Sequence, residues 1–159
     1  MRKLILLLLV CSLCLALAAC GSGDATPVSH TFDDLTIQIP QNFIDLSDED
    51  FAQGLDFVFG LDPIAVNGLR EEKAVFEAYG LTLDLEAYGN LLRASNNVTD
   101  TLAKKDGIWT FTYEANGYTY VVTLWENQDA FWTVQAYCPS KNYGSVKDKM
   151  WELLSSVTV

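Results

Sequence analysis

The sequence is poor in the residues that bind transition metals and carry out acid–base catalysis. Its 159 residues include one histidine and four cysteines. A structural zinc site needs four ligands, mostly histidine and cysteine, and a serine or cysteine nucleophile needs a base held beside it. The chain also lacks the glycine-rich patterns that bind nucleotide phosphates. We therefore expect a protein that is not an enzyme and that uses no metal and no cofactor.

Basic side chains are also scarce. Ten lysines and arginines stand against 21 aspartates and glutamates, which gives a formal net charge of −11 at pH 7. Binding to nucleic acid depends on cationic side chains that replace the counterions around the phosphates. This charge balance therefore argues against a nucleic-acid partner.

The apolar run near the start of the chain is too short for a permanent membrane span. It extends from Leu4 to Ala19, which is 16 residues, whereas a membrane-spanning helix needs about 20. Arg2 and Lys3 precede the run, and small residues end it. A basic start, an apolar middle and a small-residue end are typical of a secretory signal peptide. We predict that residues 1–19 are such a signal peptide.

The end of this run, Leu17-Ala18-Ala19-Cys20, resembles the lipobox of bacterial lipoproteins. In that family the cysteine sulfur receives a diacylglyceryl group, and the leader is cut just before the cysteine. The resemblance implies that Cys20 is the lipidated first residue of the mature protein. It places the protein at a bacterial cell membrane, on the extracytoplasmic face, where two or more acyl chains give stable attachment. The alternative is an ordinary signal peptide in which Cys20 has no role.

Residues 20–28 are mostly small and polar and are predicted to be the lipidated cysteine with a flexible tether. Residues 29–159 are predicted to be a single domain. Loss of Arg2 and Lys3 with the leader changes the side-chain charge to −11 − 2 = −13. This charge opposes adsorption to anionic lipid, so we expect contact with the membrane through the lipid anchor at Cys20.

Local patterns predict both strands and helices in this domain. Asp-Gly at 106–107 and Asn-Gly at 116–117 predict two-residue hairpin turns. Strands are predicted in a first hairpin with its turn at Asp33-Asp34 and over residues 57–60, 64–69, 98–103, 108–113, 118–125, 130–138 and 157–159. Helices are predicted from Ser47, over 71–79, after a capping Asp84, and over 142–155.

The central strands are apolar on both faces. In the strand over 118–125, Tyr120 and Val122 alternate with Val121 and Trp125. An antiparallel sheet with one face in water shows a cleaner alternation of apolar and polar residues. The pattern therefore predicts an α+β fold with a central antiparallel β-sheet flanked by helices on both faces, a three-layer α/β/α sandwich.

Three segments resemble the Mog1/PsbP-like fold. They are the opening at residues 32–40, the helix start Leu85-Glu86-Ala87-Tyr88, and the ending from Cys138-Pro139 through a helix to Ser156-Val157-Thr158-Val159. The resemblance covers most of residues 30–159 and implies a central antiparallel sheet between helical layers. In known relatives this fold serves association between proteins, so the resemblance implies no catalytic residues.

Three features could carry chemistry, and a structural role is the favoured interpretation of each. His30 could act as a base, but it lies near the tether, where we expect it to be exposed and mobile. Cys138 could act as a nucleophile, yet it shares a strand row with Trp132 and Val134 and is expected in the core. The third feature is an acidic cluster that could bind Ca²⁺ but also fits the first turn of a helix, formed by Asp45, Asp48, Glu49 and Asp50.

Aromatic residues concentrate between Trp109 and Tyr137, where packing within the sheet is the favoured explanation. Trp125 and Phe131, which flank the last hairpin turn, are predicted to be exposed and to form a candidate interaction surface. We therefore expect a lipid-anchored, non-enzymatic interaction or accessory module with an envelope protein as its partner. The alternative is a lipoprotein that binds a small ligand in an aromatic-lined pocket.

Overall fold

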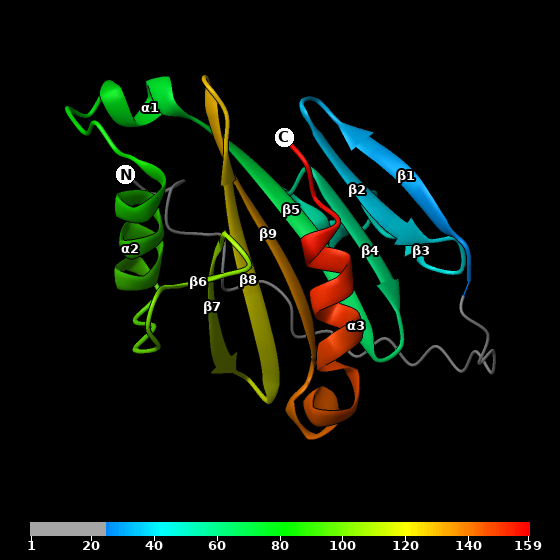
Figure 1. Ribbon diagram of the computed structural model, residues 1–159. Coiled ribbons are helices and arrows are strands. Elements are labelled where there is room, and N and C mark those ends of the chain that lie inside the picture. Colours follow the sequence, from blue (N-terminus) through cyan, green and yellow to red (C-terminus); the bar gives the residue numbers. More distant parts are fainter. Residues whose placement is uncertain (1–24) are drawn as a thin grey trace.

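A seven-stranded antiparallel sheet forms the centre of the structure, a computed structural model that describes residues 25–159 (Figure 1). Its strand order is β3-β4-β5-β9-β8-β7-β6. The predicted α+β class with a central antiparallel sheet is confirmed. The strands are β3 (Ile44–Asp45), β4 (Phe57–Leu61), β5 (Ile64–Glu72), β6 (Ala103–Lys105), β7 (Ile108–Ala115), β8 (Tyr118–Glu126) and β9 (Ala130–Pro139).

A separate two-stranded hairpin precedes this sheet. It consists of β1 (Pro27–Phe32) and β2 (Leu35–Pro40), with its turn at Asp33-Asp34 as predicted. Because β1 begins at Pro27, the folded part starts two residues earlier than expected, within the predicted tether. Proline, which lacks an N–H, is tolerated at the first residue of a strand.

The two predicted hairpin turns are confirmed. Asp106 and Gly107 join β6 to β7, and Asn116 and Gly117 join β7 to β8. All four residues have positive φ angles between 52° and 88°. A type I′ turn needs positive φ at both central residues, and Asp-Gly and Asn-Gly adopt it most readily.

The helices are α1 (Lys73–Glu77), α2 (Leu85–Ser95) and α3 (Tyr143–Ser155), with short 3-10 turns η1 (Asp50–Ala52) and η2 (Ser140–Asn142). As predicted, Asp84 caps α2, because its carboxylate accepts the Ala87 N–H at 2.8 Å. The helix predicted from Ser47 is wrong, since only η1 forms there. The Ser47 hydroxyl instead accepts the N–H of Val58 at 3.0 Å and so covers the edge of β4.

Two further predicted boundaries differ from the structure. Residues 98–102 are not a strand, because the Asp100 carboxylate, rather than the backbone, bonds the N–H of Thr112 on β7. The helix predicted over 71–79 is shortened because β5 continues to Glu72. The predicted closing strand is reduced to one bridge, in which Thr36 and Thr158 exchange backbone hydrogen bonds of 2.8 and 2.9 Å.

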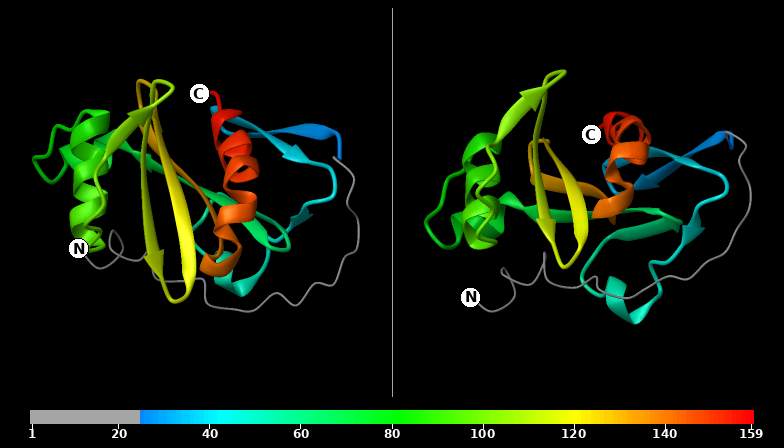
Figure 2. Two further views of the ribbon diagram at one scale, coloured as in Figure 1. Left: turned by 60° about the horizontal axis from the view of Figure 1, so that its bottom comes forward. Right: turned by 90° about the horizontal axis from the view of Figure 1, so that it is seen from below.

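Apolar side chains pack on both faces of the sheet. On one face the hairpin and α3 contribute Leu35, Ile37, Met150 and Leu154 to a core with Trp132. On the other face Phe76 from α1 and Tyr88 from α2 pack with side chains of three strands, Phe111, Val122, Leu124 and Phe131. Figure 2 shows α2 and α3 on different sides of the yellow β8 strand.

Candidate functional site

The predicted lipidation site, Cys20, lies outside the described residues, as does the predicted signal peptide. Lipidation and processing therefore stay predictions. Within residues 25–159, no helix has the length and apolar composition needed to cross a bilayer. In the same part of the chain, no three histidine, cysteine, aspartate or glutamate side chains converge as metal ligands.

The prediction that Phe131 is exposed is wrong. Its side chain is 1% exposed, and its ring stacks on Tyr88 of α2 with the centroids 4.4 Å apart. Trp125 is half-buried against the core on the other face, and its indole N–H donates to the Thr123 hydroxyl at 3.2 Å. Because side chains alternate along a strand, the two rings face opposite ways and do not form one surface. A contact role for Trp125 stays a prediction.

The other candidate residues have structural contacts. His30 lies within β1 rather than in a tether, and it is partly buried because its ring meets Phe59 edge-on at 4.8 Å, so the expected exposure of this residue is wrong. Cys138 is a free, fully buried core residue, as predicted, and burial raises the pKa of its thiol. In the acidic cluster, the Asp45 carboxylate accepts the N–H of Ser47 at 3.0 Å. This contact forms a turn in place of the expected helix start.

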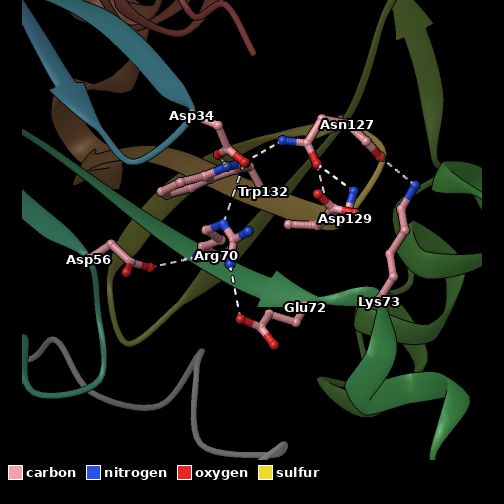
Figure 3. A network of polar contacts seen from close by, with 9 residues as sticks. Asp34, Asp56, Arg70, Glu72, Lys73, Asn127, Asp129 and Trp132 are labelled. Atoms are coloured by element: carbon pink, nitrogen blue, oxygen red, sulfur yellow. Dashed lines mark hydrogen bonds and ion pairs between the residues drawn. The ribbon is translucent and has the colours of Figure 1, made fainter.

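A network of polar contacts joins the hairpin turn to the large sheet (Figure 3). One oxygen of Asp34 accepts the indole N–H of Trp132 at 2.6 Å. The other accepts the side-chain amide of Asn127 and lies 3.6 Å from Nε of Arg70. We call the set the hairpin junction, and define it as Asp34, Asp56, Arg70, Glu72, Lys73, Asn127 and Trp132.

The other contacts of the hairpin junction hold Arg70, which is in β5, and Lys73, which begins α1. The backbone N–H of Arg70 donates to Asp56 at 2.6 Å, and its guanidinium lies 3.4 Å from Glu72. Lys73 donates to the carboxylate of Glu126 and to a backbone carbonyl at the β8–β9 turn, both at 2.7 Å. These contacts tie the start of α1 to the β8–β9 turn.

Asp34 is held in its ionised form. Burial raises its pKa, but the hydrogen bonds from Trp132 and Asn127 and the positive charge of Arg70 outweigh this effect, and the pKa of Asp34 is lowered. Both of its oxygens already face donors from the protein. The geometry therefore assigns Asp34 to holding the hairpin rather than to proton transfer.

A second polar contact lies beneath α2. The hydroxyl of Tyr88 donates to Glu71 at 2.6 Å and lies 2.8 Å from the hydroxyl of Thr133. Burial raises the pKa of Glu71, and the bond from Tyr88 offsets this in part. Burial and the nearby Glu71 charge raise the pKa of Tyr88 well above its ordinary value, so its hydroxyl stays a donor. This contact anchors α2 on β5 and β9.

A cavity of about 650 Å³ lies beside β7. Residues 95–100, from the last residue of α2 onward, form one wall, and residues 112–116 of β7 and its turn form the other. Thr119 of β8 and Tyr143 of α3 complete the lining. The charged side chains among these lining residues are Asp100 and Glu114, so the cavity is acidic. Its volume falls in the range of ligand sites, about 300–1,000 Å³.

The fold has relatives among solved structures, although no protein-family model and no curated protein matches the sequence. The solution structure of cyanobacterial PsbP (CyanoP) from Synechocystis sp. PCC 6803 matches with a TM-score of 0.58 and 16% identity. The match covers 90% of this chain and 98% of that one. The fold is PsbP-like.

A second structure supports the PsbP-like fold. A crystal structure from Bacteroides thetaiotaomicron VPI-5482 matches with a TM-score of 0.50 and 11% identity over 86% of this chain. The present chain spans about half of that protein, 49% of its length. At these identities the likeness concerns the fold alone.

Sequence reasoning missed the hairpin junction, the contact between Tyr88 and Glu71, and the polar cavity of this PsbP-like domain. The hairpin junction combines Asp34 of the β1–β2 turn with Arg70 of β5 and Trp132 of β9, which are far apart in the sequence, and no spacing pattern marks such a set. The cavity lies between residues 95–100 and β7, where the Asp100 carboxylate bonds Thr112 but no strand pairing forms. One signal was available for it: Asn96, Asn97 and Asp100 are turn-forming residues that suit a strand poorly.

Proposed function

We propose that the chain is a lipid-anchored bacterial lipoprotein whose domain is a non-enzymatic interaction or accessory module outside the cytoplasm. The observation that carries the proposal is the Leu17–Cys20 lipobox placed just before a PsbP-like domain. Six residues, 21–26, separate Cys20 from β1. Even fully extended, six residues reach only about 20 Å, so an anchored domain stays near the bilayer.

The fold supports the second half of the proposal. The resemblance to Mog1/PsbP-like proteins implies association with another protein as the role. We include in the proposal the three-layer description of the fold, with α3 and the hairpin as one outer layer and α2 as the other. Contacts of α3 with Trp132 and of α2 with Phe131, on opposite faces of β9, support it.

The anchor is tested by Cys20→Ala in a bacterial host that processes lipoproteins. We expect an unprocessed precursor that carries no acyl chains and is absent from the lipoprotein fraction. Mass spectrometry of the intact protein measures both its length and its acylation. Cys138→Ala is the matched control, because it removes a thiol that is buried in the core, and it should still be lipidated. A mature wild-type chain that begins at a residue other than Cys20 would contradict the anchor.

The accessory role is tested by crosslinking in intact cells. A tagged wild-type chain should capture a specific envelope protein. A tagged unrelated lipoprotein is the control for chance encounters. Repeated capture of nothing beyond this control would refute the accessory role.

The cavity beside β7 favours a second candidate, binding of a small polar ligand. Tyr113 and Tyr143 line it, as the predicted aromatic-lined pocket requires, but its other lining residues are mostly polar or small. Small-molecule sites are mostly apolar with a few polar groups, so this candidate is less well supported. Saturation-transfer NMR with mixtures of small sugars and amines tests it, and absence of any transfer would count against it.

A further inference from the structure

The outer edge of β7 is paired along only part of its length. β6 pairs with Ile108, Trp109 and Thr110, whereas β7 continues to Ala115. On this outer edge the Thr112 N–H donates to the carboxylate of Asp100 at 3.0 Å. Backbone groups that face the same neighbouring strand recur at every second residue. The N–H and C=O of Glu114 therefore also face outward, beside the cavity that Glu114 lines.

Near the opposite end of the sheet, the outer side of β4 is covered. There β3 pairs with Phe59 and Gly60 of β4, and the N–H of Leu46 and the hydroxyl of Ser47 bond the backbone of Val58. For Glu114, no backbone partner is found on its outer side among residues 25–159. Unpaired edges are templates for another strand, and proteins usually cover them. The chain covers the outer side of β4 and leaves a stretch of β7 open beside a cavity.

The negative charge around this open stretch indicates which kind of strand could pair with it. Glu114 is exposed, and its carboxylate lies 3.2 Å from the hydroxyl of Thr119. Asp100 adds a second carboxylate to the same cavity. The domain as a whole is strongly acidic, so a basic partner is attracted and a second copy of this chain is repelled.

We propose that residues 111–115 of β7 bind an extended, lysine- or arginine-rich segment of a partner protein. The segment adds a strand to the sheet by hydrogen bonding to Glu114, and it places basic side chains beside the Glu114 carboxylate and in the cavity. In this mode backbone bonds supply affinity and alternate side chains supply specificity. The inference rests on the proposed accessory function and deepens it by naming where the partner binds and what chemistry it carries.

The binding test uses the full lipidated chain in detergent micelles. Its probe is an acetylated hexapeptide of alternating lysine and threonine, and the matched control peptide carries glutamate in place of lysine. We expect the lysine peptide to shift NMR signals of residues 111–115 and to slow hydrogen exchange of the Glu114 amide. The glutamate peptide should do neither. Binding of both peptides with equal affinity would overturn the charge assignment.

Two variants separate the backbone bond from the charge. Glu114→Gln keeps the N–H and should weaken binding of the lysine peptide about 2- to 5-fold, as expected for the loss of one exposed ion pair. Glu114→Pro removes the N–H at an edge position, where proline is tolerated, and should weaken binding of the lysine peptide about 10-fold or more. Glu86→Gln, the same charge change on the exposed face of α2, should have no effect.

The outcomes distinguish this site from the function on which it rests. If Glu114→Pro has the unfolding midpoint of the wild type and binds the lysine peptide with unchanged affinity, the proposed site is wrong. If this variant does not fold, the deciding result comes from the wild type: a Glu114 amide that the lysine peptide does not protect from hydrogen exchange overturns the site. Protection of Glu114 by self-association without peptide also overturns it. In cells, a partner that is still captured by Glu114→Pro refutes this site and leaves the accessory function standing. Failure of the wild type to capture any partner refutes the function itself.

Discussion

At the residue scale, two carboxylates respond to their surroundings in opposite directions. The pKa of Asp34 is lowered because hydrogen bonds from Trp132 and Asn127 and the Arg70 charge outweigh its burial. Asp34 therefore contributes stability that is present above its unfolded pKa and is lost as the pH falls through the lowered folded pKa. Burial raises the pKa of Glu71, so the folded state holds that proton more tightly than the unfolded state. Ionisation of Glu71 thus costs stability as the pH rises from its unfolded to its folded pKa.

We predict that Glu71→Gln removes this cost. The glutamine oxygen can still accept the hydroxyl of Tyr88, which donates to Glu71 at 2.6 Å in the wild type, but glutamine does not ionise. The free energy of unfolding of the variant, relative to wild type, should therefore increase from about pH 4 to pH 7. Urea unfolding across this range measures it. Glu77→Gln, an exposed site on α1, is the control, and a pH-independent difference for Glu71→Gln would contradict the prediction.

At the element scale, the structure shows which signals are local. The hairpin turns at Asp106-Gly107 and Asn116-Gly117 and the cap at Asp84 depend on residues within one turn, and all were predictable. Ser47 misled the prediction because it bonds the backbone of a strand 11 residues away. Asp100, inside the strand predicted over 98–103, likewise bonds the backbone of β7, 12 residues away. A hydroxyl or carboxylate signals a cap equally well whether it bonds its own segment or a sheet edge.

The candidate site depends on the same non-local contacts. The open stretch of β7 exists because Asp100 bonds the N–H of Thr112 and the chain then joins the edge only at Ala103. Sequence patterns predicted β7 and its turn but not which of its edges is covered. The hairpin was predicted, whereas its attachment through Asp34 and Trp132 was not, because those residues are 98 positions apart.

Two glycines test how closely the elements pack. A Cβ at Gly68 of β5 would lie 2.2 Å from the ring of Phe57, which is fully buried. We predict that Gly68→Ala lowers the free energy of unfolding by about 1–3 kcal/mol, the usual cost of overpacking a core. Urea denaturation at neutral pH measures the loss.

Gly89→Ala on α2 is the matched comparison. Its Cβ would meet the ends of Leu124 and Leu102 at 2.5 and 2.9 Å, and such flexible ends yield more easily than a ring. Alanine also gains about 1 kcal/mol over glycine within a helix. We therefore expect a smaller loss than at Gly68, and the reverse order would contradict the packing described for Phe57.

At the scale of the whole molecule, the first and last described elements close the same core. The β1–β2 hairpin forms a sheet of its own, without strand pairing to the seven-stranded sheet. It is held by apolar packing, by the hairpin junction and by the bridge between Thr36 and Thr158, while Ser156 accepts the N–H of Gln38 at 3.0 Å. Figure 1 shows the end of the chain beside β2. A unit with so few backbone links to the rest is expected to open before the central strands.

We predict that Thr158→Pro makes this opening easier without unfolding the sheet. Proline removes the Thr158 N–H that donates to the Thr36 carbonyl at 2.9 Å and so weakens the bridge. Native-state hydrogen exchange should speed up at the amides of Thr36 and Gln38, while β8 and β9 keep their protection. Thr158→Val keeps the backbone N–H and the side-chain shape, so its exchange should match the wild type. Equal acceleration in β8 and β9 would instead mean that the hairpin and the large sheet open together as one cooperative unit.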